Sequence, residues 1–80
     1  MPTPSPKASR YASPSEIGFR LRWVRENQGL TFREVSKKSG VSIGIIHRVE
    51  KGRNVELRNF LAIIEALNVQ IETVLMRSGA

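Results

Sequence analysis

The 80-residue chain has no cysteine and a single histidine, His47. Without cysteine there is no disulfide framework, no thiolate metal site and no thiol nucleophile. One histidine with so few companions cannot assemble a zinc site, so we expect neither a metal nor another cofactor. No apolar run approaches the roughly 20 residues that span a bilayer, and no apolar signal-peptide core follows the N-terminus. We therefore expect a cytoplasmic protein without a membrane partner.

Acidic residues are few relative to basic ones. Thirteen Lys and Arg against seven Asp and Glu give a formal net charge of +6. This balance favours a polyanionic partner, which could be DNA, RNA or an anionic membrane. The sequence shows no paired carboxylates, no nucleophile–base set and no phosphate-binding glycine loop, so an enzyme is not expected. A core of this size is marginal alone, so a partner subunit or a ligand would help to stabilise it.

The two ends of the chain have the composition of disordered segments. Residues 1–12 are rich in proline, serine and small residues and carry Lys7 and Arg10. We interpret them as a disordered basic arm, and residues 77–80 as a disordered tail. A solvated arm without a role is the simplest interpretation, and an arm that reaches a DNA minor groove is the alternative.

A first helix is predicted from the residues that follow the arm. Ser13 is a suitable N-cap, Pro14 fits the first helical position, and Glu16 completes a capping box. The helix should run to about Gln28, with an apolar stripe on one face and most of its arginines, including Arg25, outside that stripe.

Two aromatic residues of this helix, Phe19 and Trp23, lie off the apolar stripe and are four residues apart. We expect them to widen the buried face, because small domains use aromatic residues to seal their cores. The alternative is an exposed apolar patch that binds a partner protein.

The segment from Leu30 to Gly52 predicts two short helices joined by a turn. Thr31 and Glu34 form the T-x-x-E pattern of a capping box. Gly40 follows a cationic last turn and tolerates the left-handed conformation that ends a helix. Ser42 offers the N-cap of the second helix. Two helices in this arrangement form a helix-turn-helix, whose second helix can enter the major groove of DNA.

A fourth helix is predicted over residues 56–67 and ends near Asn68, which closes a helix-turn-helix domain over residues 13–68. Its apolar stripe consists of Leu57, Phe60, Leu61, Ile64 and Leu67.

The segment over residues 69–76 shows the alternation of a strand. Its alternating positions are Val69, Ile71, Thr73 and Leu75. Residues with high strand propensity dominate, so we predict a strand here rather than a short fifth helix. A lone strand needs a partner, and the same strand of a second subunit is the simplest one. These four residues are therefore expected to form the interface of a homodimer.

The predicted helix-turn-helix matches a longer pattern, L-T-x-x-E-[LV]-[AS]-x-x-x-G-V-S-x-x-x-I-x-x-[IV]-E-x-G. The matching residues are Leu30, Thr31, Glu34, Val35, Ser36, Gly40, Val41, Ser42, Ile46, Val49, Glu50 and Gly52. The chain thus resembles the Xre/Cro-type helix-turn-helix regulators of bacteria and phages, over about residues 17–75. The resemblance implies an all-α, lambda-repressor-like domain of four to five helices, with a short C-terminal β-strand that pairs across a dimer.

Among the subfamilies, the chain is most similar to the HipB-like antitoxins. The shared features are the Ser13-Pro14 opening, the apolar spacing from Val55 to Leu67 and a terminal strand. The chain departs from the family at Phe32, where a glutamine that contacts DNA is usual. It also departs at residues 43–45, where Ile, Gly and Ile replace polar side chains. These departures leave few hydrogen-bonding groups to read bases directly.

The family register implies which residues would face DNA. The base-facing residues would be Ile43, Gly44, His47 and Arg48. The clustering of basic residues around the two motif helices predicts phosphate contacts at Arg33, Lys37, Lys38, Lys51 and Arg53, and the helix starts at Thr31 and Ser42 add anion sites. Arg48 is expected to be the main reader, because its guanidinium can bond both guanine O6 and N7, although a phosphate contact is nearly as plausible. Glu50 is expected to be the partner of a structural ion pair or a cap.

These features favour a dimeric, sequence-specific repressor that binds a double-stranded DNA operator. The resemblance implies the antitoxin of a type II toxin–antitoxin module, which represses its own operon and binds a Hip-type kinase toxin. One alternative is a phage-type repressor or a restriction–modification controller without a toxin partner. The other is a protein-interaction module that uses its apolar surface.

Overall fold

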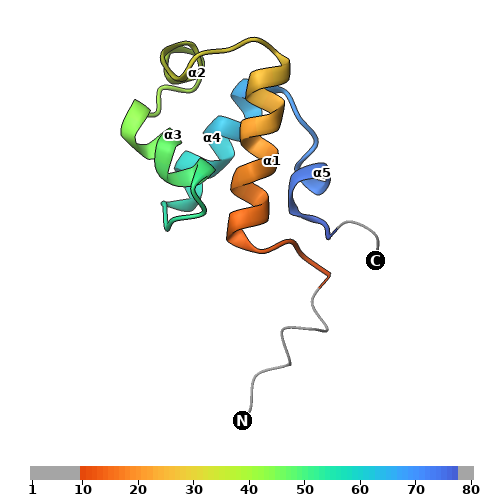
Figure 1. Ribbon diagram of the computed structural model, residues 1–80. Coiled ribbons are helices and arrows are strands. Elements are labelled where there is room, and N and C mark those ends of the chain that lie inside the picture. The colour runs from red at the N-terminus through yellow and green to blue at the C-terminus, as the bar shows by residue number, and fades with distance from the viewer. Residues whose placement is uncertain (1–9, 78–80) are drawn as a thin grey trace.

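The computed structural model describes residues 10–77, which fold into five helices joined by short connections (Figure 1). In chain order the helices are α1 (Pro14–Asn27), α2 (Phe32–Ser39), α3 (Ile43–Glu50), α4 (Leu57–Leu67) and α5 (Ile71–Leu75). Helix α1 lies between α3 and α5, and α2 packs against α3 and α4. The predicted all-α architecture is confirmed for these residues, with α2 and α3 as the helix-turn-helix.

The core receives at least one fully buried side chain from every helix. These side chains are Leu21 of α1, Val35 of α2, Ile46 of α3, Ile63 and Leu67 of α4, and Val74 of α5. Burial of each one stabilises the fold by about 1.5–3 kcal/mol. The shared core therefore fixes α2 and α3 against the rest of the domain.

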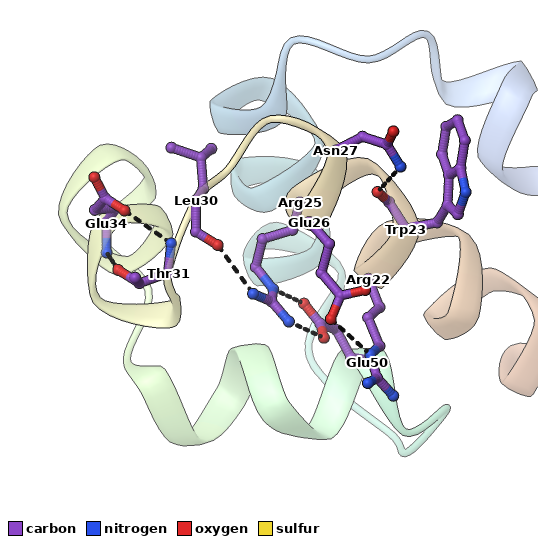
Figure 2. Close-up of polar contacts among 9 residues, drawn as sticks. All are labelled: Arg22, Trp23, Arg25, Glu26, Asn27, Leu30, Thr31, Glu34 and Glu50. Atoms are coloured by element: carbon purple, nitrogen blue, oxygen red, sulfur yellow. Dashed lines mark hydrogen bonds and ion pairs between the residues drawn. The ribbon is translucent and has the colours of Figure 1, made fainter.

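Both predicted capping boxes are present. The Ser13 hydroxyl accepts from the Glu16 backbone N–H at 3.2 Å, and the Glu16 carboxylate accepts from the Ser13 N–H at 3.0 Å. Thr31 and Glu34 make the same exchange at 3.1 and 2.8 Å (Figure 2). The hydrogen bonds that the backbone donates hold the pKa of both glutamates below its ordinary value. This contribution to stability is present above the ordinary pKa and is lost as the pH falls through the lowered one.

The turn between α2 and α3 follows the prediction closely. Gly40 ends α2 in the left-handed conformation, with φ of 76°, and Val41 after it is buried. Ser42 then caps α3 by accepting a hydrogen bond from the Ile45 N–H at 3.3 Å. The turn therefore aims α3 through local hydrogen bonds and one anchored side chain.

Helix α1 crosses the end of α3 at Gly18, which is buried. A Cβ at Gly18 would collide with the backbone carbonyl oxygens of Val49 and Glu50. Only glycine permits so close an approach, so Gly18 allows the end of α3 to pack directly against the backbone of α1.

The predicted C-terminal strand over residues 69–76 is wrong, because this segment contains the short helix α5. The Met76 N–H donates to the Glu72 carbonyl at 2.9 Å and closes the last turn. Arg20 of α1 donates to the Val74 carbonyl at 3.1 Å and also to the Met76 carbonyl. Backbone groups that a strand would have offered to a second subunit are thus satisfied within the same chain.

The four residues expected to form the dimer strand do not share one exposed side. Val69, Ile71 and Leu75 are half-buried, and Thr73 is exposed. A helix of five residues is too short to show a helical period, so its residues produced the alternation of a strand by chance.

The expected arm over residues 1–12 and tail over residues 77–80 are wrong where the structure describes them. Two backbone hydrogen bonds of 2.7 Å join the ends, from Ala12 N–H to the Leu75 carbonyl and from Arg77 N–H to the Arg10 carbonyl. Ala12 is also buried. Residues 10–12 and 77 are therefore anchored beside α5, and the rest of both predictions lies outside the described residues.

The expected burial of Phe19 and Trp23 is also wrong, since 65% and 59% of their surfaces are exposed. Leu21 lies on the inner face of α1, and residues two positions before and after it point to the opposite side of the helix. Leu57 and Leu61 of α4 are exposed as well, although the predicted apolar stripe includes both. The described surface therefore carries large apolar side chains on both α1 and α4.

Candidate nucleic-acid interface

One face of α3 and of the residue after it is exposed. Its exposed residues are Ile43, Gly44, His47, Arg48 and Lys51. Their spacing places them on one side of the helix, while Ile46 and Val49 on the other side are buried in the core. The structure thus brings together all four residues predicted to face bases.

The basic residues predicted to contact phosphate are exposed too. They are Arg33, Lys37 and Lys38 of α2, and Lys51 and Arg53 after α3. Val35 is completely buried and holds α2 with Arg33, Lys37 and Lys38 outward. Helix α2 packs directly against α3, so these three cations lie on the helix next to the exposed face of α3.

Thr31 and Ser42 are the N-cap residues just before the two motif helices, and both are exposed. Each hydroxyl oxygen accepts a cap hydrogen bond, from the Glu34 and Ile45 N–H groups respectively. The hydroxyl hydrogens remain available, so either residue can still donate to a phosphate oxygen.

Arg25 of α1 holds the end of α3 in place, a role that the sequence did not indicate. Its Nε and Nη2 atoms donate to the two carboxylate oxygens of Glu50 at 2.6 and 3.1 Å, and Nη1 donates to the Leu30 carbonyl at 2.9 Å (Figure 2). The hydrogen bonds with Glu50 raise the pKa of Arg25 further above its ordinary value. The expectation that Glu50 forms a structural ion pair is confirmed.

The side chains of this ion pair are only 10% and 8% exposed. The sequence contained a signal for the burial of Arg25, because the residue lies one helical turn after Leu21 on the inner face of α1. Arginine is rarely buried without a partner, so its charge argued against burial.

Phe32, which departs from the family pattern, connects three helices. Its half-buried ring stacks on the His47 ring, with centroids 3.8 Å apart and an interplanar angle of 21°. The Arg25 guanidinium carbon lies 4.0 Å from the centroid of the same ring. Phe32 therefore links the buried ion pair of α1 and α3 to His47 on the exposed face of α3.

Arg48 is exposed, but its guanidinium is engaged by its own chain. The Nε and Nη2 atoms donate to the Asn54 carbonyl at 3.2 and 2.9 Å. The side chain thus ties the end of α3 to the connector that carries Arg53. The role of Arg48 in base reading stays a prediction.

A pocket of about 500 Å³ lies beside the stacked rings. It is lined by Arg22, Arg25, Glu26, Phe32, His47, Glu50 and Lys51. Arg22 pairs with Glu26 at 3.2 Å, and Arg25 pairs with Glu50, so most of its charges are neutralised within the protein. Among the described residues, no group of three histidine or acidic side chains could hold a metal ion, and no helix could cross a membrane.

The fold and the open face of α3 define the class of the molecule, a helix-turn-helix domain. The chain belongs to the helix-turn-helix domain family, whose sequence profile matches residues 16–75. It is 39% identical over 64 residues to the transcriptional regulator ClgR from two strains of Mycobacterium tuberculosis. That alignment covers 79% of this chain and 57% of ClgR, so the chain spans little more than half the length of these relatives.

Two solved structures are similar in fold and in sequence. The restriction–modification controller protein C.AhdI from Aeromonas hydrophila is 33% identical, and the match covers 75% of this chain and 92% of that one, with a TM-score of 0.68. The clp gene regulator ClgR from C. glutamicum is 29% identical, with 76% and 80% covered and a TM-score of 0.67. The chain is thus similar to two kinds of gene regulator.

Proposed function

We propose that the protein is a sequence-specific, DNA-binding transcriptional regulator. The exposed face of α3 reads bases in the major groove, and the cations of α2 and of the turn after α3 bind the phosphates on either side. One observation carries the proposal: the open face of α3 and the exposed cations lie on two adjacent helices that one core holds rigid.

Within that class, we favour a controller or regulator without a toxin over an antitoxin. C.AhdI is named as a restriction–modification controller, and the match covers 92% of its chain at 33% identity. The ClgR proteins are named as transcriptional or clp gene regulators. None of these relatives is named as an antitoxin, so they support the controller alternative. In the simplest mechanism, the bound regulator represses by occupying its operator.

A homodimer remains part of the proposal, and an apolar groove supports an interface other than the C-terminal strand. An open apolar groove of about 370 Å³ is lined in part by Val55, Leu57, Phe60 and Leu75. Leu57 is 69% exposed at its rim. A second copy that covers this groove would bury these side chains and present two reading helices to a two-fold symmetric operator. Half-sites about 34 Å apart would fit that arrangement.

Salt-dependent binding to duplex DNA tests the proposed function. The DNA is a duplex selected by the wild-type protein from a library with a randomised centre. Its affinity is measured at several salt concentrations for the wild type and for Lys37→Ala/Lys38→Ala. Each lost phosphate contact should reduce the slope of log affinity against log salt by about 0.9, so this variant should lower it by up to about 2.

Arg10→Ala is the matched control, because it removes a cation at the α5 end of the molecule, where the Arg10 carbonyl accepts from Arg77. The control should leave the slope unchanged. Absence of salt-dependent binding to any duplex would refute the proposed function, and an equal loss in the control would place the contact surface elsewhere.

A further inference from the structure

We propose that His47, rather than Arg48, is the hydrogen-bonding base reader of α3, and that its target is a guanine edge in the major groove. This inference rests on the proposed function, because it needs α3 to enter that groove. It is carried by a difference between the two side chains. The exposed His47 ring is stacked on Phe32, whereas the Arg48 guanidinium already bonds the Asn54 carbonyl.

The His47 imidazole is exposed and oriented at the same time. Its ring stacks on Phe32 at 3.8 Å between centroids, and its nitrogen atoms have no hydrogen-bond partner among the described residues. A donor held in one orientation loses little freedom when it binds, which favours a selective contact. His47 therefore presents a ring N–H that is free and directed.

The support beneath His47 is rigid. Phe32 is half-buried and contacts the Arg25 guanidinium, which makes three hydrogen bonds to Glu50 and Leu30. The chain of contacts runs from a buried ion pair through an aromatic ring to the imidazole. Supporting contacts of this kind lock the rotamer of the presented side chain, so the arrangement fits a positioned reader.

Gly44 opens the space next to the imidazole. It lies three residues before His47 on the same face, and a Cβ built at Gly44 would have no atom within 4 Å. The free protein has no packing reason for a glycine at this position. The missing side chain instead allows a base edge to approach the helix backbone beside the imidazole.

Arg48, in contrast to His47, is hydrogen-bonded within its own chain. Two donor nitrogens of its guanidinium, Nε and Nη2, already bond the Asn54 carbonyl. These contacts use two of the five N–H donors and hold the guanidinium against the connector, which leaves only the Nη1–Nη2 edge for a base. We therefore assign Arg48 as a positioning residue, which holds the Asn54 connector and thereby Arg53.

The chemistry favours guanine as the target of His47. An imidazole N–H is a donor, and guanine presents two acceptors, N7 and O6, in the major groove. Adenine presents N7 beside an amino group that is itself a donor, which faces the imidazole less favourably.

The test begins with duplexes selected by the wild-type protein from a library with a randomised centre. Affinity for the selected duplex is then compared with versions in which each guanine in turn becomes 7-deazaguanine, which lacks the N7 acceptor. One position should weaken wild-type binding by about 5- to 20-fold, and His47→Ala should lose that sensitivity. Arg48→Ala should keep the sensitivity while it weakens all duplexes alike.

His47→Gln and Phe32→Leu sharpen the result. Glutamine pairs best with adenine, so His47→Gln should move the preference at that position from guanine to adenine. Phe32→Leu removes the stacked ring and should reduce discrimination while binding to unselected duplex DNA persists.

The outcomes separate the inference from the proposed function. If the wild type selects no sequence, the proposed function fails. If His47→Ala remains folded by circular dichroism and keeps the 7-deazaguanine sensitivity, or if Arg48→Ala alone abolishes it, then DNA binding stands and the assignment of His47 is overturned.

Discussion

Helices α2 and α3 lie on one side of α1, and α5 lies on the other (Figure 1). Both sides carry exposed side chains, but these are held differently. On the α2–α3 side, caps, a buried ion pair and a ring stack fix the exposed residues in place. On the α1–α5 side, Phe19 and Trp23 are largely exposed. Helix α5 there depends on hydrogen bonds from Arg20 of another helix.

The contrast shows that the exposed side chains of the α2–α3 side are held more firmly than those of the α1–α5 side. A reading surface must keep donors in position before a ligand arrives, because ordering them on binding weakens affinity. The α1–α5 side closes the core and joins the two ends of the described chain, and the side chains of Phe19 and Trp23 there are largely exposed. Predictions that disturb one side and spare the other test this difference.

The largest effect is expected from Arg25→Ala. Removal of the guanidinium leaves the Glu50 carboxylate buried without its partner, which should lower the free energy of unfolding by about 3–5 kcal/mol. Chemical denaturation measures the loss.

Arg22→Ala is the matched control for Arg25→Ala. Arg22 pairs with Glu26 on the same helix, but the two side chains are 59% and 53% exposed. Solvent screens such a pair, so the loss should stay below about 1 kcal/mol. Equal losses in the two variants would contradict the role assigned to the buried ion pair.

Two glycine-to-alanine substitutions should act in opposite directions. Gly18→Ala forces a Cβ against the carbonyl oxygens of Val49 and Glu50, and it should lower the free energy of unfolding by about 1–3 kcal/mol. Gly44→Ala meets no atom and improves helix propensity, so it should raise that free energy by up to about 1 kcal/mol.

DNA affinity distinguishes the two glycines further. Gly44→Ala should bind the selected duplex more weakly although the protein is more stable, because the new methyl group lies where DNA approaches. Wild-type affinity for Gly44→Ala would show that α3 does not come so close to the bases.

A smaller and local effect is expected from Arg20→Ala. Loss of the hydrogen bonds to the Val74 and Met76 carbonyls should destabilise α5 by about 1–2 kcal/mol. Amide hydrogen exchange should accelerate in α5 while protection in α2 and α3 is kept. Uniform acceleration across all helices would mean that α5 is not a separate, weaker unit.

The smallest effect is expected from Trp23→Ser. The side chain is mostly exposed, so the free energy of unfolding should change by less than about 0.5 kcal/mol. Thermal unfolding followed by circular dichroism provides the measurement. A loss comparable to that of Gly18→Ala would show that Trp23 is covered in solution.

The sequence predicted the motif helices well because their ends depend on neighbouring residues. Thr31, Gly40 and Ser42 act within a few positions of themselves, so their pattern contains the information that places α2 and α3. The exposed face of α3 followed from the resemblance to the family, whose register agrees with helical spacing. Local sequence was therefore enough to predict the motif and its exposed residues.

The remaining features depend on residues far apart in the chain. The Val74 carbonyl of α5 accepts from Arg20, more than fifty positions away, and the buried Arg25 pairs with Glu50. The stack of Phe32 on His47 likewise forms only after α2 packs against α3. Local sequence patterns do not indicate such contacts. The strand was therefore predicted wrongly, and the contacts of Arg25 and Phe32 that support α3 were not predicted.

The most direct test of the account is a map of backbone amide chemical shifts during titration with the selected duplex. The largest changes should fall in residues 31–39 and 42–53, with small changes around Phe19, Trp23 and α5. Changes concentrated on Phe19, Trp23 and α5, with α3 unaffected, would contradict the claim that this protein reads DNA through α3.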